Sequence, residues 1–211
     1  MKDDLQLHDA WRSGDRRAGA ELFDRYYEPL ARFFRNKVEE SAGDDLLQSV
    51  FLACAEARDG FRGQSSFRAY LFGVAHNQLY KLYRSRKRSP ELVDFESVCT
   101  GELGVSHGAG LQLREEQRLL LRALRHIPVE YQEVLELHYW EQMETAEIAQ
   151  VMGSPPGTVK SRLRRGRQLL EEQLRTLAPT REVLESTLGG LERWAVSVRE
   201  RMPPREGNER P

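Results

Sequence analysis

Residues 154–170, SPPGTVKSRLRRGRQLL, set two prolines and a glycine ahead of a run that has five basic residues and no acidic one. Directly upstream, residues 145–153, TAEIAQVMG, have the spacing of a short helix that ends at a glycine. Ser154 is a good N-cap, and Pro155 fits the first helical position, where a missing N–H costs nothing. The stretch therefore predicts two helices joined by a sharp turn at Gly153.

The second of these helices has two distinct faces. Its inward face is predicted from residues spaced four, three and four apart: Val159, Leu163, Gly166 and Leu170. Its outward face collects the polar residues Lys160, Ser161, Arg164, Arg165, Arg167 and Gln168. This pattern favours a helix-turn-helix whose second helix enters the DNA major groove. The alternative is a solvated surface helix, which usually mixes Glu with Lys or Arg, whereas five bases alone repel one another unless a polyanion neutralises them.

The length and composition of the chain indicate a globular protein. The chain has 211 residues, 39% hydrophobic and 31% charged, which is typical of one large or two small globular domains. No apolar run reaches the roughly 20 residues of a membrane span, and the first residues do not resemble a signal peptide, so we expect a cytoplasmic protein. Cys54 and Cys99 form no disulfide framework or metal motif, and Cys54 is expected to be a small core residue.

The formal net charge of −1 hides an uneven distribution. Residues 75–90 contain five basic residues and no acidic one, and residues 154–168 repeat that balance. Between them, residues 89–111 contain four acidic residues and no basic one. Two basic patches on either side of an acidic connector indicate two nucleic-acid contacts on one chain, although charged helix faces are often merely solvated.

The apolar spacing is helical almost throughout, so the fold class is predicted to be all-α. Helices are expected after a cap at Asp15, after a restart at residues 41–45, and from near Phe67 behind a serine cap. We expect two small helical domains, residues 1–90 and 113–178, joined by a flexible acidic linker, 91–112, and followed by a helical extension and disordered tail, 179–211. The apolar stripe of that extension either packs on the second domain or binds a regulator.

These residues resemble a known family. Residues 127–170 are similar to the promoter-reading C-terminal domain of bacterial RNA polymerase sigma factors of the extracytoplasmic-function group, with the run Gly157–Leu163 (GTVKSRL) intact. Residues 22–38, 44–57 and 61–88 resemble the other sigma domain, in the right order. The resemblance covers about residues 5–88 and 113–176. It implies two helical domains, the second containing the helix-turn-helix.

The resemblance also implies roles for individual residues. It places core-polymerase contacts at Asp44, Asp45, Gln48 and Phe51. It places recognition of the minus-ten element and strand melting at Phe61, Tyr70, Asn77, Tyr80, Tyr83, Arg84, Arg86, Lys87 and Arg88. It places recognition of the minus-thirty-five element at Lys160, Ser161, Arg162, Arg164 and Arg165. Aromatic rings suit melting because they replace base stacking, but core packing is the open alternative for each of them.

Three positions depart from the family pattern: Lys81, where Asp is common, Tyr70, where Trp is common, and Glu144, where a capping Ser is common. The first two put the minus-ten preference in question rather than the class. The implied partners are core RNA polymerase, promoter DNA and an anti-sigma factor, with one copy of the chain in the holoenzyme.

The sequence supports two other classes of function less well than it supports a sigma factor. A helix-turn-helix repressor or activator that binds its operator alone would carry a sensing or dimerising N-terminal domain, and residues 1–90 show no such pattern. An enzyme is not expected, because the five histidines lack metal or triad spacing and no phosphate-binding loop is present. We therefore assign no catalytic residue, metal or cofactor.

Overall fold

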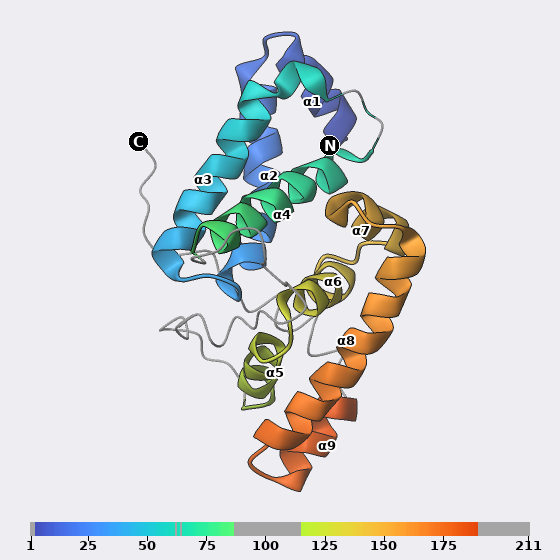
Figure 1. The fold of residues 1–211 in the computed structure, drawn as a ribbon. Helices are drawn as coiled ribbons and strands as arrows, with labels where there is room; N and C mark the ends of the chain where they lie inside the picture. Colours follow the sequence, from blue (N-terminus) through green and yellow to red (C-terminus); the bar gives the residue numbers. More distant parts are fainter. Residues whose placement is uncertain (1–2, 62, 64, 87–114, 190–211) are drawn as a thin grey trace.

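A computed structural model describes residues 3–61, 63, 65–86 and 115–189, and the regular structure in these ranges is helical (Figure 1). The N-terminal group is α1 (Asp4–Arg12), α2 (Arg16–Arg35), α3 (Glu40–Glu56), a 3-10 turn (Arg58–Gly60) and α4 (Phe67–Arg86). The C-terminal group is α5 (Glu115–Arg125), α6 (Val129–Tyr139), α7 (Thr145–Met152), α8 (Pro156–Leu177) and α9 (Arg181–Gly189). The all-α prediction is confirmed. The predicted linker, 91–112, lies outside the described residues.

Helix starts in the N-terminal group follow local capping. The Asp15 carboxylate accepts hydrogen bonds from the amides of Arg17 and Ala18 at 2.9 and 3.2 Å, as expected. Ser66 Oγ accepts one from the Ala69 amide at 3.1 Å, which starts α4 where the serine cap was predicted. The restart predicted at residues 41–45 is wrong. The helix α3 already begins at Glu40, and the Gly43 amide bonds to the Glu39 carbonyl, because a glycine in a first helical turn does not break it.

The N-terminal core forms where α2, α3 and α4 pack together. Its largest fully buried side chains include Phe34, Phe67 and Phe72. Cys54 lies in the same core, where burial raises the pKa of its thiol to about 12. The expectation that Cys54 is a small core residue is confirmed.

The C-terminal group contains the helix-turn-helix, formed by α7 and α8. Gly153 ends α7 in the left-handed region, at φ 58°, as the sharp turn requires. The predicted start of α8 is wrong by one residue. Pro156 takes the first helical position, Pro155 is the N-cap, and Ser154 Oγ instead donates to the Met152 carbonyl at 3.3 Å. The inward residues Val159, Leu163, Gly166 and Leu170 are all buried, as predicted.

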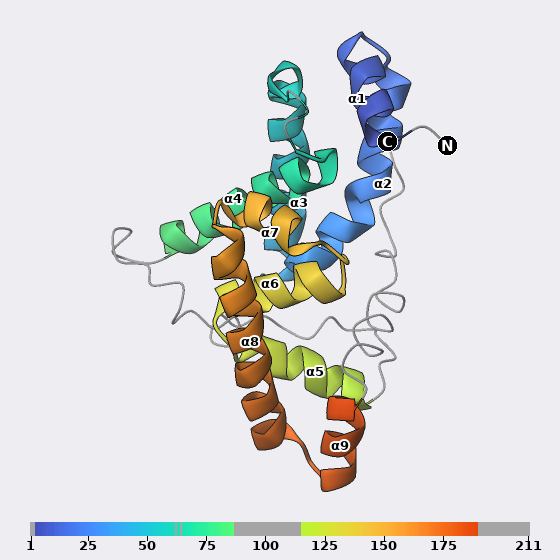
Figure 2. The ribbon, with the colours of Figure 1, turned by 90° about the vertical axis from the view of Figure 1, so that its right-hand side faces the viewer.

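The extension after α8 folds back on the domain. The helix α9 lies against α5, with Val183, Leu184 and Leu188 packed on the core (Figure 2). The apolar stripe of this extension was expected either to pack on the second domain or to bind a regulator. Residues 181–189 pack on the domain.

The two groups of helices lie against each other, with α7 beside α4 (Figures 1 and 2). Among the described residues, no helix is both long and apolar enough to cross a membrane.

Candidate nucleic-acid interface

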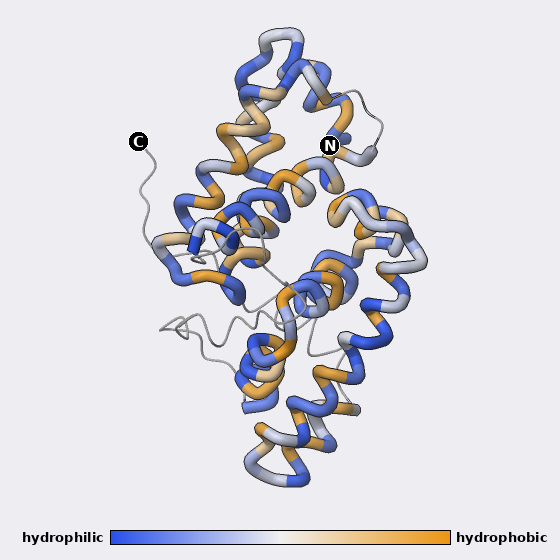
Figure 3. Tube along the Cα trace, in the orientation of Figure 1, coloured by the Kyte–Doolittle hydropathy of each residue, from blue (hydrophilic) through white to orange (hydrophobic). Residues whose placement is uncertain are grey.

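The helix α8 presents a basic face to solvent. Lys160, Ser161, Arg164 and Arg165 are all exposed, while the residues between them seat the helix on α6 and α7. Figure 3 shows the resulting alternation of hydrophilic and hydrophobic segments along α8. A helix of this diameter, with one face basic and the other anchored, fits the major groove of B-DNA.

Arg162 differs from the other four residues predicted to read the minus-thirty-five element. Its guanidinium lies 2.6 Å from a carboxylate oxygen of Glu130 on α6, and it also donates to Ser154 Oγ at 3.3 Å. The Arg162 side chain is 24% exposed and that of Glu130 is 5% exposed. The Arg162 side chain therefore links α8 to α6, and the spacing of basic residues in the sequence could not predict this role.

The C-terminal end of α4 carries the second basic patch. Asn77, Arg84 and Arg86 are exposed there, as a DNA-facing helix requires. Lys81 of the same patch is also exposed, and the remaining two basic residues, Lys87 and Arg88, lie outside the described residues.

Three aromatic residues predicted to face DNA are buried. Phe61 packs on His8, Tyr70 and Phe67 with ring centroids 4.8, 5.0 and 5.6 Å apart. Tyr83 donates to the Lys37 carbonyl at 2.9 Å. The Tyr80 ring packs on the His76 ring, with the two ring centroids 4.2 Å apart. Burial raises the pKa of both tyrosines far above the usual value. Of the predicted aromatic residues, Tyr70 is the one that is only partly buried.

The residues predicted to contact polymerase share one side of α3. Asp44, Asp45 and Gln48 are exposed, and Phe51 is half-buried against Phe23, 4.9 Å between ring centroids. Leu52, which sequence reasoning missed, is 58% exposed and lies one helical turn beyond Gln48. An exposed leucine beside exposed acids suits a protein-binding surface.

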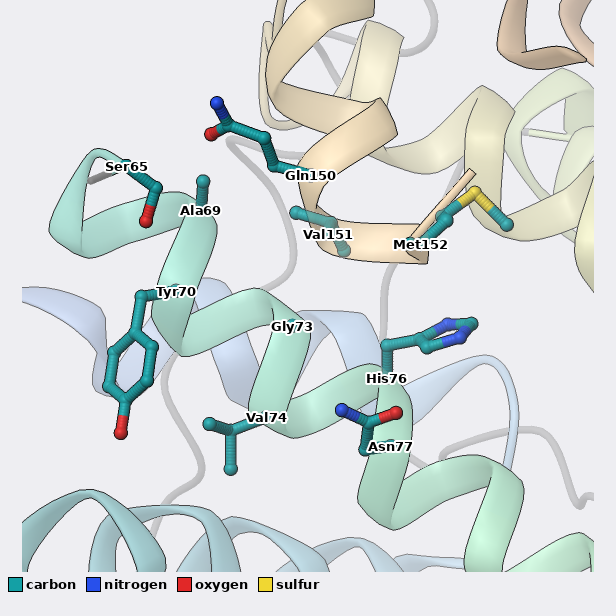
Figure 4. A pocket seen from close by; sticks show the side chains of 11 residues that line it. Ser65, Ala69, Tyr70, Gly73, Val74, His76, Asn77, Gln150, Val151 and Met152 are labelled. Atoms are coloured by element: carbon teal, nitrogen blue, oxygen red, sulfur yellow. The ribbon is translucent and has the colours of Figure 1, made fainter. Parts of the chain in front are cut away.

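A groove of about 470 Å³ lies between α4 and α7 (Figure 4). Tyr70, Gly73 and Asn77 line it on one side, and Val151 and Met152 line it on the other. The two helices lie close together at Gly73, where a Cβ atom would lie 3.6 Å from the Val151 carbonyl oxygen. The first helix of the helix-turn-helix thus packs on the helix predicted to read the minus-ten element.

Ion pairs join the same two groups of helices. Lys37, which follows α2, pairs with Glu136 of α6, Arg32 donates to Glu141 at 2.8 and 2.9 Å, and His76 Nδ1 lies 2.8 Å from Glu133. Sequence reasoning missed all of them, because charged residues in amphipathic helices are expected to face water. No cluster able to hold a metal ion occurs within the described ranges.

Two family models match this chain. Residues 22–89 match Sigma-70 region 2, and residues 117–170 match Sigma-70, region 4. Together they cover more than half of the chain, in the order that sequence analysis predicted. The first match contains α4, and the second contains α7 and the part of α8 that ends at Leu170.

Curated relatives and solved structures agree with these models. The ECF RNA polymerase sigma-E factor of Escherichia coli (strain K12) is 28% identical over 182 residues, covering 82% of this chain and 95% of the relative. The sigma-E factor of Haemophilus influenzae is 25% identical over 186 residues, covering 82% and 96%. CnrH, solved in complex with the cytosolic domain of CnrY, has a TM-score of 0.62 at 26% identity and covers 82% of this chain and 97% of its own.

A further solved structure shows the same fold. The sigma factor RpoE of Bartonella quintana, in complex with the anti-sigma factor NepR, has a TM-score of 0.57 at 24% identity, over 76% of this chain and 97% of its own. The two matched regions, their order and these relatives agree with the basic helix-turn-helix described above. The chain therefore belongs to the sigma-70 family, as an RNA polymerase sigma factor of the extracytoplasmic-function group.

Proposed function

We propose a division of labour between the two regions of this sigma factor. Residues 1–90 bind core polymerase through α3 and read and melt the minus-ten element with α4. Residues 113–178 read the minus-thirty-five element with α8, and residues 91–112 connect the two. The observation that supports this proposal most strongly is the α8 face, where four basic or polar side chains point to solvent from a helix anchored by buried residues.

The minus-thirty-five contact follows from the geometry of α8. Lys160 and Ser161 stand in its N-terminal half, which in a helix-turn-helix meets base edges. Arg164 and Arg165 stand one turn later, where they meet bases or phosphates. Arg162 supports the domain through Glu130 rather than reading a base.

The minus-ten contact uses the basic end of α4 together with its exposed polar residues. Asn77 reads bases, while Arg84 and Arg86 neutralise the backbone. Tyr70 supplies an aromatic surface that is already partly exposed, whereas the Tyr80 side chain is buried.

The partners follow from this role. Core polymerase meets the exposed acids of α3, and promoter DNA meets α4 and α8. An anti-sigma factor is a further partner, since the structure of a similar sigma factor, RpoE of Bartonella quintana, contains one. The chain acts in the cytoplasm and catalyses no reaction itself, because the polymerase performs the chemistry of RNA synthesis.

DNA binding by the purified chain, with and without core polymerase, tests this proposal against a helix-turn-helix regulator that acts alone. A sigma factor binds promoter DNA tightly and specifically in the presence of core. Tight, specific duplex binding without core would refute the proposal and favour the alternative.

A further inference from the structure

The first helix, α1, lies outside the residues that the family models match. The match to Sigma-70 region 2 begins at residue 22, beyond the end of α1. The Asp4 carboxylate of α1 bonds to the Arg25 guanidinium and to the Tyr26 hydroxyl of α2. The Trp11 indole lies on Gly19 of α2, where a Cβ atom would lie 2.5 Å from a ring carbon. Both ends of α1 are therefore fixed on α2.

His8 lies where α1 meets the turn between α3 and α4. Its side chain is buried, and its Nε2 atom lies 3.1 Å from the Arg58 carbonyl oxygen. Because a carbonyl oxygen only accepts hydrogen bonds, Nε2 carries a hydrogen and donates it. The Arg58 guanidinium lies 5.9 Å from the centre of the Trp11 ring, within the range of a cation–π contact. The helix α1 thus holds Arg58 by its backbone and by its side chain.

A column of aromatic rings continues from His8 to the surface of α4. The His8 and Phe61 ring centroids lie 4.8 Å apart, and the Phe61 and Tyr70 centroids lie 5.0 Å apart. His8 and Phe61 are buried, whereas Tyr70 is only partly buried. Figure 4 shows the Tyr70 ring pointing away from Val151 and Met152 of α7. Tyr70 is therefore the outermost ring of the column, and Phe61 and His8 support it from inside.

A ring that stacks on an unpaired base binds best when its orientation is already fixed. A side chain that is free to rotate loses rotamer freedom on binding, and this loss weakens the complex. Phe61, which supports Tyr70, is the residue at which the 3-10 turn ends. Asp59 and Gly60 in this turn are exposed, so the turn depends on the contacts that Arg58 and Phe61 make with α1.

We propose that His8 is a positioning residue for promoter melting: it holds Arg58 and Phe61, and through them it fixes the Tyr70 ring on which an unpaired base of the minus-ten element stacks. The inference rests on the proposed role of Tyr70 in the minus-ten contact. Loss of one base–aromatic stack changes an equilibrium by about 5- to 150-fold. Loosening the ring should cost less than removing it, so the effect of changing His8 should lie near the lower limit.

The test measures strand opening by a holoenzyme assembled from core polymerase and the full-length chain. The DNA is a promoter fragment that run-off transcription identifies. It carries 2-aminopurine in the minus-ten element, and the fluorescence of this base rises when the strands separate. The rate of the rise is measured over a range of holoenzyme concentrations, below the melting temperature of every variant. The limiting rate reports opening, and the half-saturating concentration reports binding to the duplex.

A set of variants separates positioning from folding. His8→Ala removes the inner ring and its donor, Tyr70→Ala removes the stacking ring, and the double variant shows whether the two residues act through one path. His8→Gln is the conservative variant, because it keeps a side-chain N–H donor. Leu30→Ala, a change of a buried residue of α2, is the matched control for a loss of stability alone.

His8→Ala should lower the limiting opening rate about fivefold and Tyr70→Ala about tenfold, while both half-saturating concentrations stay within about twofold of the wild-type value. The double variant should open no more slowly than Tyr70→Ala, because His8 acts through that ring. His8→Gln should recover most of the rate. Leu30→Ala should open at the wild-type rate although it unfolds at a lower temperature.

A wild-type opening rate in His8→Ala, with Tyr70→Ala slow, would overturn the role of His8 and leave that of Tyr70. A wild-type rate in Tyr70→Ala would refute the proposed role of Tyr70 and the inference with it. Losses that multiply in the double variant, or an equal loss in Leu30→Ala, would also overturn the inference, because His8 would then act on another group or on stability. If His8→Ala does not fold, His8→Leu, which fills the buried space without a ring or a donor, takes its place.

Discussion

Replacing Arg162 with alanine should separate structural from DNA-reading roles on α8. Its side chain is three-quarters buried, and its guanidinium lies 2.6 Å from a Glu130 carboxylate that is 5% exposed. Arg162→Ala removes this cation from a buried anion. We therefore expect a loss of folding stability that none of the exposed residues on the same helix would cause.

The magnitude lies between two limits. Breaking a fully buried pair costs about 3–5 kcal/mol, and an exposed pair contributes about 0–1 kcal/mol. A pair with one buried and one partly exposed member should cost about 2 kcal/mol. For a chain of this size, that loss lowers the melting temperature by about 4–8 °C.

The assay is urea unfolding of Arg162→Ala, Glu130→Ala and the double variant, so that the coupling free energy is measured directly. Arg164→Ala, two residues along and exposed, is the control and should change the free energy of unfolding by no more than about 0.5 kcal/mol. Zero coupling, with Arg162→Ala as stable as wild type, would show that Arg162 is available to DNA and that our interpretation of its position is wrong.

Four other predictions follow from particular residues. Lys160→Ala or Arg164→Ala in the holoenzyme should weaken minus-thirty-five binding by about 1–3 kcal/mol without loss of stability, and equal binding in a filter assay would argue against the α8 contact. Leu52→Glu should weaken binding to core polymerase about tenfold, which is about 1.4 kcal/mol. Leu5→Glu changes a leucine that is also exposed but lies on α1, and it should not weaken binding. Equal effects of the two substitutions would show that α3 does not contact the polymerase. Gly166→Val should cost about 1–3 kcal/mol in urea unfolding, because even a Cβ atom there lies 3.3 Å from Leu135 and Tyr131; a fully stable variant would contradict this packing. Burial lowers the pKa of His76, but the neighbouring Glu133 outweighs burial and raises this pKa above 6.5. Protonated His76 therefore stabilises the contact between the two groups of helices fully below about pH 6.5, and this stabilisation is lost as the pH rises through the raised pKa. Small-angle X-ray scattering from pH 6 to 9 should show the chain opening, and His76→Gln should remove that pH dependence.

Local signals in the sequence were sufficient to predict most of the helices. Asp15 and Ser66 cap the helices that follow them, and the spacing of Val159, Leu163 and Leu170 identifies the buried face of α8. The errors were also local. The restart was predicted at residues 41–45 although α3 already begins at Glu40, and the second of two adjacent prolines, rather than the first, starts α8.

Contacts between residues far apart in the sequence could not be predicted from local patterns. Nothing near Lys37 in the sequence shows that Glu136 neutralises it, and Arg162 looks like its neighbours until Glu130 is placed beside it. Tyr83 has the residue type of a stacking platform, but its hydroxyl donates to a backbone carbonyl inside the N-terminal core. Spacing identifies a helix face, whereas tertiary packing decides whether that face meets water, DNA or another helix.

Run-off transcription with purified core polymerase on genomic DNA fragments tests the central claim most directly. A sigma factor with the two readers described here directs core to discrete start sites, each preceded by shared elements near minus ten and minus thirty-five. Arg164→Ala should reduce these transcripts while the free energy of unfolding stays unchanged. Specific transcripts that depend on the chain are the predicted result, and core that initiates no differently with and without the chain would contradict the account.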